Sequence, residues 1–248
     1  MQSALYVSLS AQVTLEKRLE TIANNMANMK TSGFRADAVK FDTMLSRAAS
    51  QSVAFSTPGE NFISRKPGSV THTGNSLDVA VAGNAWMGFS GPSGTVYTRD
   101  GRMQITSTGE LQTVTGFPVL DSGGTSITID PEGGPVTISS NGTNTQGINE
   151  VGQLGLFEIP ADAKLTRFAN SGVVPDRAAT TVTDFLKIGG QKIGFEQGYV
   201  EGSNVDPMTE LTQMMNASRA FQSVSSVVES SESTMQNAIR SLGEPTKA

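Results

Sequence analysis

Apolar residues recur at helical spacing along the first thirty positions of the chain. Between residues 5 and 29, six of the eight positions spaced alternately by three and four residues are apolar. This spacing aligns side chains on one face of a helix, as in a coiled coil. No glycine or proline lies in residues 1–32, and Gly33 follows as a stop signal. The pattern predicts a helix over about residues 3–29.

A second stripe of the same kind occupies the last segment. Seven of the ten positions with this spacing between residues 211 and 242 are apolar. Asp206 and Pro207 indicate a helix start, as N-cap and first helical residue, and Gly243 ends the stretch. Each stripe alone fits an amphipathic helix packed on the chain's own core. Two long stripes at opposite ends of one chain favour helices that pair with each other and with partners.

The middle of the chain follows a strand pattern. It holds 22 of the 26 glycines, between residues 74 and 202, and short apolar alternations. Asp100 and Gly101, flanked by residues 96–99 and 102–105, predict a two-residue hairpin. Further strands are expected at residues 77–81, 127–129, 136–138 and 154–156. The expected β-core consists of Leu77, Val79, Val81, Ile127, Ile129 and Leu156.

These elements predict a fold of mixed α and β class. The N- and C-terminal helices are expected to pair as a coiled-coil-like bundle, and the centre to form an antiparallel β sandwich or small barrel domain. Four parts are expected along the chain: an N-terminal assembly helix at 1–33, an extended connector at 34–74 with a short helix near 38–48, a β-domain at 75–202, and a C-terminal assembly helix at 203–248.

Composition narrows the class of function. The formal net charge is −5, and no cluster of basic residues marks a nucleic-acid binder. The chain has no cysteine, which excludes disulfides and thiolate chemistry. No apolar run approaches the ~18 residues of a membrane span, so no direct membrane insertion is expected. The first residues carry no basic leader, and we expect export without a cleaved signal peptide.

Candidate chemistry is sparse. His72 is the only histidine, and no second His or Cys completes a zinc site or a nucleophile pair. Acidic residues of the β-region leave open a hydrolase that uses two carboxylates. These residues are Glu150, Glu158, Asp162, Asp176 and Asp184. The sequence brings no two of them together, so we expect no catalytic residue, no cofactor and no metal site.

Three stretches, one in each part of the chain, carry a resemblance to a known family. The first is Ile-Ala-Asn-Asn-Met-Ala-Asn at 22–28 with Thr-Ser-Gly-Phe-Arg at 31–35. The second is Leu-Asp-Val-Ala-Val-Ala-Gly at 77–83 with Tyr-Thr-Arg-Asp-Gly at 97–101. The third is Gly-Tyr-Val-Glu-Gly-Ser-Asn-Val at 198–205, which leads into Arg-Ala-Phe at 219–221. Together they resemble the axial proteins of the bacterial flagellum, which include the rod and hook subunits.

The resemblance implies a structural subunit of the basal-body rod, most similar to the proximal-rod member, with the distal-rod subunit as the alternative. Such a subunit polymerises through its terminal helices into the drive shaft that carries torque within the periplasm. The implied partners are copies of itself, other proximal and distal rod subunits, and the flagellar export apparatus. A secreted surface-binding β-domain on a helical oligomerisation stalk remains as a hypothesis of a different class.

The resemblance and the two stripes together place candidate interface residues in both terminal segments. In the first segment they are Leu5, Leu15, Leu19, Ile22, Asn24, Asn25, Met26, Asn28, Gly33 and Phe34. In the last segment they are Ser203, Asn204, Val205, Leu211, Met214, Arg219, Phe221, Val228, Met235, Ile239 and Leu242. The short amides of Asn24, Asn25 and Asn28 either bridge closely packed helices or cap their ends, or they simply belong to a fraying helix terminus.

Overall fold

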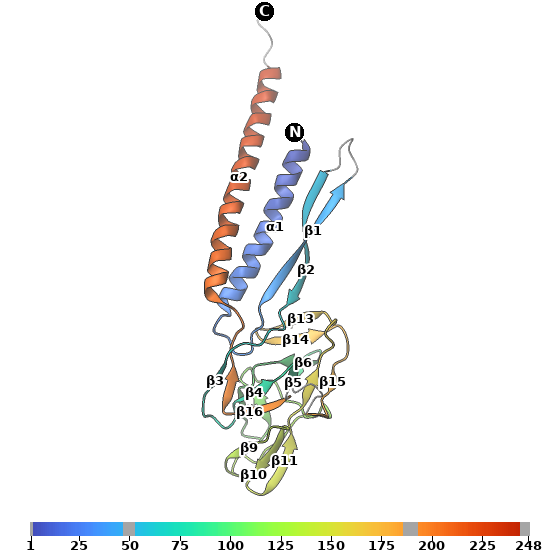
Figure 1. Ribbon diagram of the computed structural model, residues 1–248, viewed down its shortest axis with the longest axis vertical. Coiled ribbons are helices and arrows are strands. Elements are labelled where there is room, and N and C mark those ends of the chain that lie inside the picture. The colour runs from blue at the N-terminus through green and yellow to red at the C-terminus, as the bar shows by residue number, and fades with distance from the viewer. Residues whose placement is uncertain (1, 47–52, 186–192, 244–248) are drawn as a thin grey trace, which may run out of the picture. The chain divides into compact units, whose positions relative to one another are not determined.

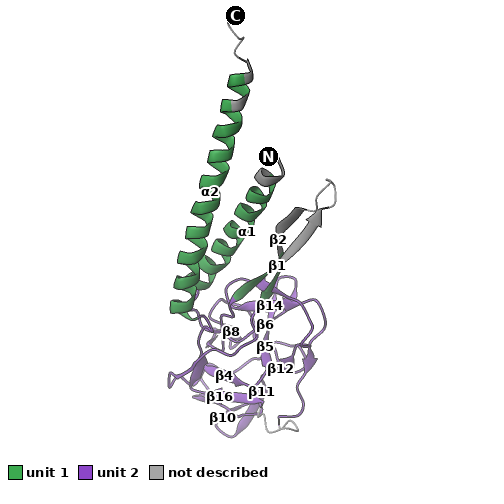
Figure 2. Cartoon of the chain, turned by 45° about the horizontal axis from the view of Figure 1, so that its top comes forward, with its two compact units in different colours: residues 1–27, 37–62, 206–248 green, residues 28–36, 63–205 purple. Residues whose placement is uncertain are grey.

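The computed structural model describes residues 2–46, 53–185 and 193–243. The chain divides into two compact units, which Figure 2 shows in different colours. Unit 1 comprises residues 1–27, 37–62 and 206–248, and unit 2 comprises residues 28–36 and 63–205. Both terminal segments therefore belong to one unit, although the whole of the other unit separates them in the sequence.

Unit 1 is built on two long helices, α1 (Gln2–Ala27) and α2 (Pro207–Gly243), which lie side by side (Figure 1). Both predicted helices are confirmed. They run antiparallel, because Asn25 near the end of α1 donates to Glu210 near the start of α2. Since α1 has 26 residues and α2 has 37, α2 is longer by about three turns. In the part of the chain that the structure describes, neither helix is long and apolar enough to cross a membrane.

The start of α2 has the predicted cap. The Asp206 carboxylate accepts hydrogen bonds from the backbone N–H of Met208, at 3.1 Å, and from the hydroxyl of Thr209. Pro207 is the first helical residue, where a missing N–H costs nothing. The bond from Thr209 and those from the backbone stabilise the ionised carboxylate, and they hold the pKa of Asp206 below its usual value.

Asn25 joins three segments of unit 1. Its buried amide donates to the carbonyl of Asp37, at 2.9 Å, and to the Glu210 carboxylate, at 3.1 Å, and it accepts from the N–H of Asp37, at 2.9 Å. Asn24 donates to the Asp37 carboxylate. Asn25 thereby links α1 to β1 and to α2, and Asn24 links α1 to β1, while the role of these amides in subunit contacts stays a prediction. Burial raises the pKa of Glu210, against the lowering effect of the bond from Asn25.

The connector differs from its prediction. A short helix near residues 38–48 was expected, and this is wrong: β1 (Asp37–Ser46) and β2 (Val53–Ile63) form a two-stranded sheet. Residues 47 and 48 lie outside the described residues. From residue 39 to residue 43, Val39, Phe41 and Thr43 alternate with the charged residues Lys40 and Asp42. This period of two suits a strand, and it outweighs the absence of glycine and proline that suggested a helix.

Unit 2 contains a six-stranded antiparallel sheet with the order β13-β14-β6-β5-β12-β15. Its strands are β5 (Ala85–Gly91), β6 (Gly94–Thr98), β12 (Leu156–Glu158), β13 (Leu165–Phe168), β14 (Gly172–Pro175) and β15 (Thr180–Thr181). Short connections such as residues 92–93 join neighbouring strands, so glycine and proline concentrate in this part of the chain.

Smaller antiparallel sheets complete unit 2. They are the pairs β4 (Val79–Ala82) with β16 (Gly194–Gln197), β3 (Val70–His72) with β17 (Tyr199–Glu201), and β7 (Met103–Ile105) with β8 (Leu111–Thr113), and the trio β9 (Val136–Ile138), β10 (Thr143–Gln146) and β11 (Asn149–Gln153). The antiparallel β-class is confirmed. These sheets are open, so the barrel alternative is wrong, and the sandwich stays a prediction.

The main core of unit 2 lies among these sheets. Five of the six predicted core residues are buried in it, and Leu77 is partly buried against it. A second cluster packs around Trp86, Tyr97 and Phe157. The hairpin predicted at Asp100 and Gly101 does not form, because β6 pairs with β5 and β14 while β7 pairs with β8. Gly101 instead packs on the backbone of Val79, whose carbonyl oxygen would lie 1.8 Å from an added Cβ.

Gly33 makes the turn after α1 possible. It has a left-handed φ of 68°, and an added Cβ would lie 2.1 Å from the backbone nitrogen of Asp100. Phe34, the next residue, is completely buried. The predicted stop at Gly33 is thus a left-handed turn followed directly by a buried aromatic residue.

We expect Gly33→Ala to destabilise unit 2 more than Gly116→Ala. Both glycines have positive φ, but nothing lies within 4 Å of an added Cβ at Gly116. Gly116→Ala should lower the free energy of unfolding by about 1–2 kcal/mol, because alanine disfavours a left-handed backbone. Gly33→Ala should lower it by about 1–3 kcal/mol more, because its Cβ also clashes with the backbone of Asp100. Urea denaturation of both variants measures the difference, and equal losses contradict the close approach.

The cap of α2 gives a pH-dependent prediction. A carboxylate with a lowered pKa stabilises the fold above its unfolded pKa of 3.8, and this contribution disappears as the pH falls through the lower folded value. Asp206→Ala should therefore lower the helical melting temperature at pH 7 and have less effect at the acid end. Asp206→Asn is the matched control, since it keeps an oxygen acceptor without the charge. If Asp206→Ala lowers the melting temperature by the same amount at every pH, the charge of Asp206 does not contribute to the cap.

Candidate functional site

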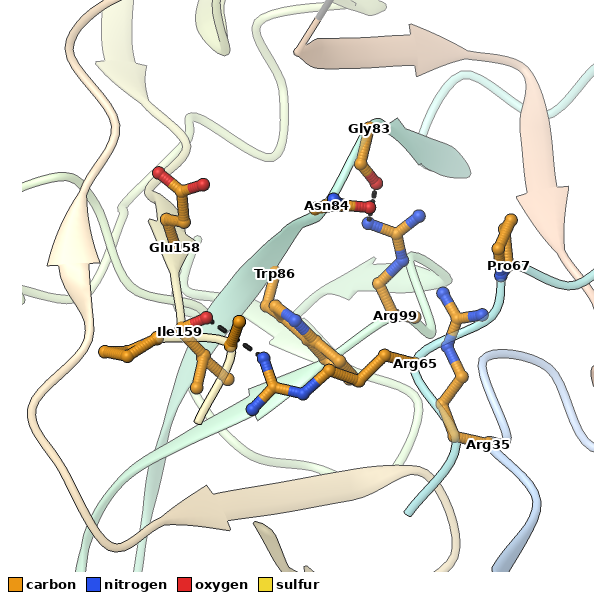
Figure 3. Close-up of a pocket in the computed structure, with 11 residues that line it drawn as sticks. Arg35, Arg65, Pro67, Gly83, Asn84, Trp86, Arg99, Glu158 and Ile159 are labelled. Atoms are coloured by element: carbon orange, nitrogen blue, oxygen red, sulfur yellow. Dashed lines mark hydrogen bonds between the residues drawn. The ribbon is translucent and has the colours of Figure 1, made fainter. Parts of the chain in front are cut away.

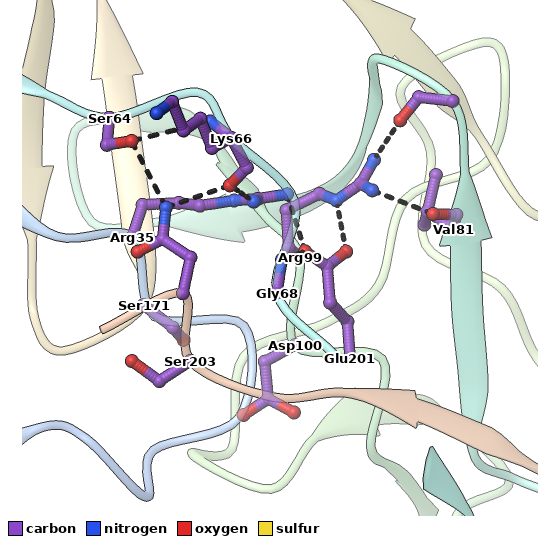
Figure 4. Close-up of polar contacts among 12 residues, drawn as sticks. Arg35, Ser64, Lys66, Gly68, Val81, Arg99, Asp100, Ser171, Glu201 and Ser203 are labelled. Carbon is purple, nitrogen blue, oxygen red and sulfur yellow. Dashed lines mark hydrogen bonds and ion pairs between the residues drawn. The ribbon is translucent and has the colours of Figure 1, made fainter. Parts of the chain in front are cut away.

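One charged residue from each of the three motif regions meets in unit 2. Arg35 is the last residue of the first motif and Arg99 lies in the second, and both line a cavity (Figure 3). Glu201, from the third motif, lies between the two guanidiniums (Figure 4). We call Arg35, Arg99 and Glu201 the ion triad.

The ion triad is almost completely removed from solvent. The Nη2 of Arg35 lies 2.6 Å from Oε1 of Glu201, and the Nε of Arg99 lies 2.7 Å from Oε2. The side chains are 3%, 3% and 1% exposed for Arg35, Arg99 and Glu201. Such burial makes each pair depend on the others, because removal of one partner leaves an uncompensated charge inside the protein.

Backbone groups complete the coordination of the triad. The Arg99 guanidinium donates to the carbonyls of Val81, at 2.7 Å, of Gly83, at 2.9 Å, and of Ala85. Glu201 ends β17 and accepts a further bond from the N–H of Gly68, at 2.9 Å. The charges are therefore fixed by strands and by the turn between β4 and β5.

The electrostatics of the triad suit a cross-link and not catalysis. Burial lowers the pKa of Arg35 to about 10, against the opposing charge of Glu201, and the charge of Arg99 lowers it further. Burial also lowers the pKa of Arg99. Arg35 still stays protonated at neutral pH, and the Glu201 carboxylate is saturated with donors.

The same place joins the segment that follows α1 to the segment that precedes α2. The N–H of Gly33 donates to the carbonyl of Glu201, at 2.8 Å, and the N–H of Asn204 donates to the carbonyl of Phe34, at 3.3 Å. The Asn204 side chain accepts from the N–H of Ala36, at 2.7 Å, and donates to the carbonyl of Lys66, at 2.8 Å. Residues 33–36 and 201–204 are thus bonded to each other.

A further arginine covers this joint. The Arg167 guanidinium lies 4.4 Å from the centre of the Phe34 ring, donates to the carbonyl of Arg35, and donates to the carbonyl of Asn170 at 2.8 Å. A cation above an aromatic face is attracted by the ring quadrupole. Phe34 is therefore held from above as well as by burial.

The predicted interface residues fall into four groups. Buried ones are Ile22, Asn25, Gly33 and Phe34. Partly buried ones are Leu15, Leu19, Met26, Asn28, Ser203, Asn204, Val205, Met214, Phe221, Val228 and Met235. Exposed ones are Asn24, Leu211, Arg219 and Ile239. The side chains of Leu5 and Leu242 lie outside the description. The structure brings Gly33, Phe34 and Asn204 together at the triad, and a role of the set in subunit contacts stays a prediction.

Sequence reasoning missed two features. Arg35, Arg99 and Glu201 stood inside the quoted stretches, and their opposite charges were the signal that was not used. The stripes also left out apolar residues of α1 and α2 that face solvent. These are Tyr6, Leu9, Val13, Met208, Met215 and Val227.

Of the residues weighed for enzyme chemistry, Glu158 lines the same cavity as Arg35 and Arg99, and His72, Asp162 and Asp176 do not. His72 is exposed on β3, and the centre of its ring lies 4.8 Å from the centre of the Tyr199 ring. Asp162 pairs with Arg177 at the surface, and Asp176 accepts a bond from the N–H of Lys164. Among the described residues, no group of three or more His, Asp or Glu side chains is arranged to hold a metal ion.

Three family models match the chain in the order in which its motifs occur. Residues 5–35 match the flagella basal body rod protein family, and residues 80–145 match the D1 domain of the flagellar hook protein FlgE/F/G family. Residues 196–241 match the C-terminal region of the flagellar basal body rod FlgEFG proteins. Each matched region contains or adjoins one member of the ion triad.

Full-length relatives agree with the family models. The flagellar basal-body rod protein FlgF of Mesorhizobium japonicum is 42% identical, over 98% of this chain and 99% of the relative. FlgF of Rhizobium meliloti is 40% identical over the same shares, and FlgF of Caulobacter vibrioides is 36% identical over 98% and 99%. The chain therefore belongs to the family of flagellar basal-body rod proteins, as a FlgF-like structural subunit of the proximal rod.

Proposed function

We propose that this rod subunit polymerises through α1 and α2. Unit 2 holds the segment that follows α1 and the segment that precedes α2. The observation that carries the proposal is a second row of apolar side chains on each helix, turned to solvent. Proteins rarely leave contiguous apolar rows exposed unless a partner covers them.

The exposed rows follow helical spacing. On α1 the row consists of Tyr6, Leu9 and Val13, and on α2 it consists of Met208, Leu211 and Met215. Successive members are three or four residues apart, so each row lies along one side of its helix. The mutual packing of α1 and α2 leaves both rows uncovered. They suit coiled-coil-like packing against the helices of neighbouring subunits.

The far end of α2 offers a further contact. Because the helices are antiparallel and α2 is longer, its last turns extend beyond the start of α1. Ile239 in this region is 64% exposed. An apolar side chain on an unpaired helical extension suits insertion between helices of another subunit.

The finer parts of the function follow from this assembly. Copies of the chain and other rod subunits are the partners we infer for the exposed rows, and the flagellar export apparatus is the inferred route of delivery. The assembled rod would lie in the periplasm and transmit torque along its axis. The support for these parts is the rod family itself, together with the exposed helical rows.

The ion triad has a mechanical role in this proposal. It fixes residues 33–36 and 201–204 to the β-structure of unit 2, and these segments lead directly into β1 and α2. A load on either segment meets buried, charge-assisted hydrogen bonds instead of a flexible linker. Deletion of one triad member should therefore loosen both segments at once.

The first test adds a charge to an exposed row. Met215→Asp and Val13→Asp change side chains that are 46% and 48% exposed, so the melting temperature of the purified chain should barely change. In the assembled rod each carboxylate would be buried without a partner, at a cost of several kcal/mol. We expect loss of rod incorporation and of motility in a strain that lacks the native protein.

Asn216→Asp is the control for this test. It adds the same charge one residue from Met215, at an exposed position about 100° around the helix. It should leave motility intact. Normal motility of the Met215→Asp and Val13→Asp strains would refute the assembly surface. A large fall in the melting temperature of the purified variants would show that these side chains stabilise the monomer instead.

The second test concerns the triad. Glu201→Gln leaves two buried guanidiniums without a counter-charge, and we expect unit 2 to lose about 3–5 kcal/mol of stability in urea denaturation. Asp162→Asn is the matched control, because it removes the carboxylate of the exposed pair with Arg177 and should cost about 0–1 kcal/mol. Similar small losses in both variants would show that the triad does not hold the segments.

A further inference from the structure

Unit 2 contains a cavity of about 210 Å³ whose wall includes three arginines. Arg35, Arg65 and Arg99 come from three separate segments and surround Trp86 (Figure 3). Glu158 lies on the opposite part of the wall. Arginines concentrated around one cavity are typical of sites that receive an anion.

The hydrogen-bond partners of these arginines leave one buried donor free. Arg99 donates to Glu201 and to three backbone carbonyls. Arg65 donates to the carbonyls of Ile159, at 3.0 Å, and Ala163, at 2.9 Å. Both terminal nitrogens of Arg35 have partners in Lys66 and Glu201. The Nε of Arg35, a residue 3% exposed, has no partner among the described residues. A buried N–H without an acceptor is costly, so an acceptor at this position would be favoured.

The charges around the cavity favour an anion with a single charge. Three guanidiniums face two carboxylates, Glu158 in the wall and Glu201 behind Arg35 and Arg99. Asp162 also acts on Arg65, but its charge is balanced by its ion pair with Arg177. One positive charge is therefore in excess. A group with one negative charge neutralises this excess, whereas a doubly charged phosphate would leave the site negative and lie close to Glu158.

We propose that this cavity binds a carboxylate, one oxygen of which accepts the hydrogen bond from the Nε of Arg35. The planar guanidinium matches the planar carboxylate, and the charge strengthens the bond. The indole of Trp86, whose ring centre is 5.7 Å from the Arg35 guanidinium carbon, helps to keep that side chain in place.

Two sources supply such a group. One is a small dissolved carboxylic acid. The other is an Asp or Glu side chain of a neighbouring rod subunit, which rests on the proposed function. Both present the same chemistry to Arg35, and they differ in whether the carboxylate arrives on a peptide backbone.

The Nε–H signals of arginine in nitrogen-15 NMR spectra of the dilute full chain test the proposal directly. Addition of sodium formate or acetate should shift the Arg35 signal until it saturates. The Arg99 signal should stay in place, because its Nε already donates to Glu201 at 2.7 Å. Sodium chloride at the same ionic strength is the control. A shift that does not saturate, or an equal shift with chloride, overturns the proposal.

Substitution of the wall carboxylate tests the charge argument. Glu158→Gln removes the negative charge that lines the cavity, and acetate should bind several-fold more tightly. Glu150→Gln is the control, since Glu150 is exposed on β11 and does not line the cavity. Equal acetate affinity in wild type and Glu158→Gln overturns the placement of the ligand in this cavity. If Glu158→Gln does not fold, the wild-type titration still decides the proposal.

A capped glutamate, N-acetyl-glutamate N-methylamide, separates the two sources. Tighter binding than acetate supports a subunit side chain, and exclusion of the capped glutamate while acetate binds supports a free acid. No binding by either overturns the site. The measurement uses unassembled chain, so its failure is independent of whether the exposed helical rows mediate polymerisation.

Discussion

The carboxylate of Glu201 compensates two guanidiniums that lie far apart in the sequence, and unit 2 depends on this compensation. A buried arginine is tolerated only when its charge is paired and its donors are satisfied. Glu201 pairs the charges of both Arg35 and Arg99. Backbone carbonyls, such as that of Val81, accept the remaining hydrogen bonds of Arg99. The segment after α1, the strands around Arg99 and the segment before α2 are held at one point.

This arrangement explains how a rod subunit combines two kinds of unit. The helices of unit 1 carry apolar rows suited to neighbours, and they need little internal core beyond their mutual packing. Unit 2 has a hydrophobic core among its strands, and it holds both the segment that follows α1 and the segment that precedes α2. In the function that we propose, assembly and anchorage are separate physical tasks, one based on apolar surface and the other on buried charge.

The site was only half visible in the sequence. Gly33, Phe34 and Asn204 could be selected because they follow helix stop signals or lie in a family motif, and the structure brings them together. Arg35, Arg99 and Glu201 lay inside the same stretches, but nothing local distinguishes a buried triad from solvated charges. Burial and pairing depend on where distant segments meet, which spacing along the chain does not encode.

By itself the sequence determined the two helices, the cap at Asp206 and the turn at Gly33, because helix bonds and left-handed glycines are local features. Only the tertiary structure decided which strands pair. A hairpin at Asp100 and Gly101 was reasonable from local turn preference, yet β6 gains more by pairing within the six-stranded sheet. It also decided the open sheets and the triad. Strand pairing and charge burial are settled by contacts between remote residues, whose free energy outweighs local preference.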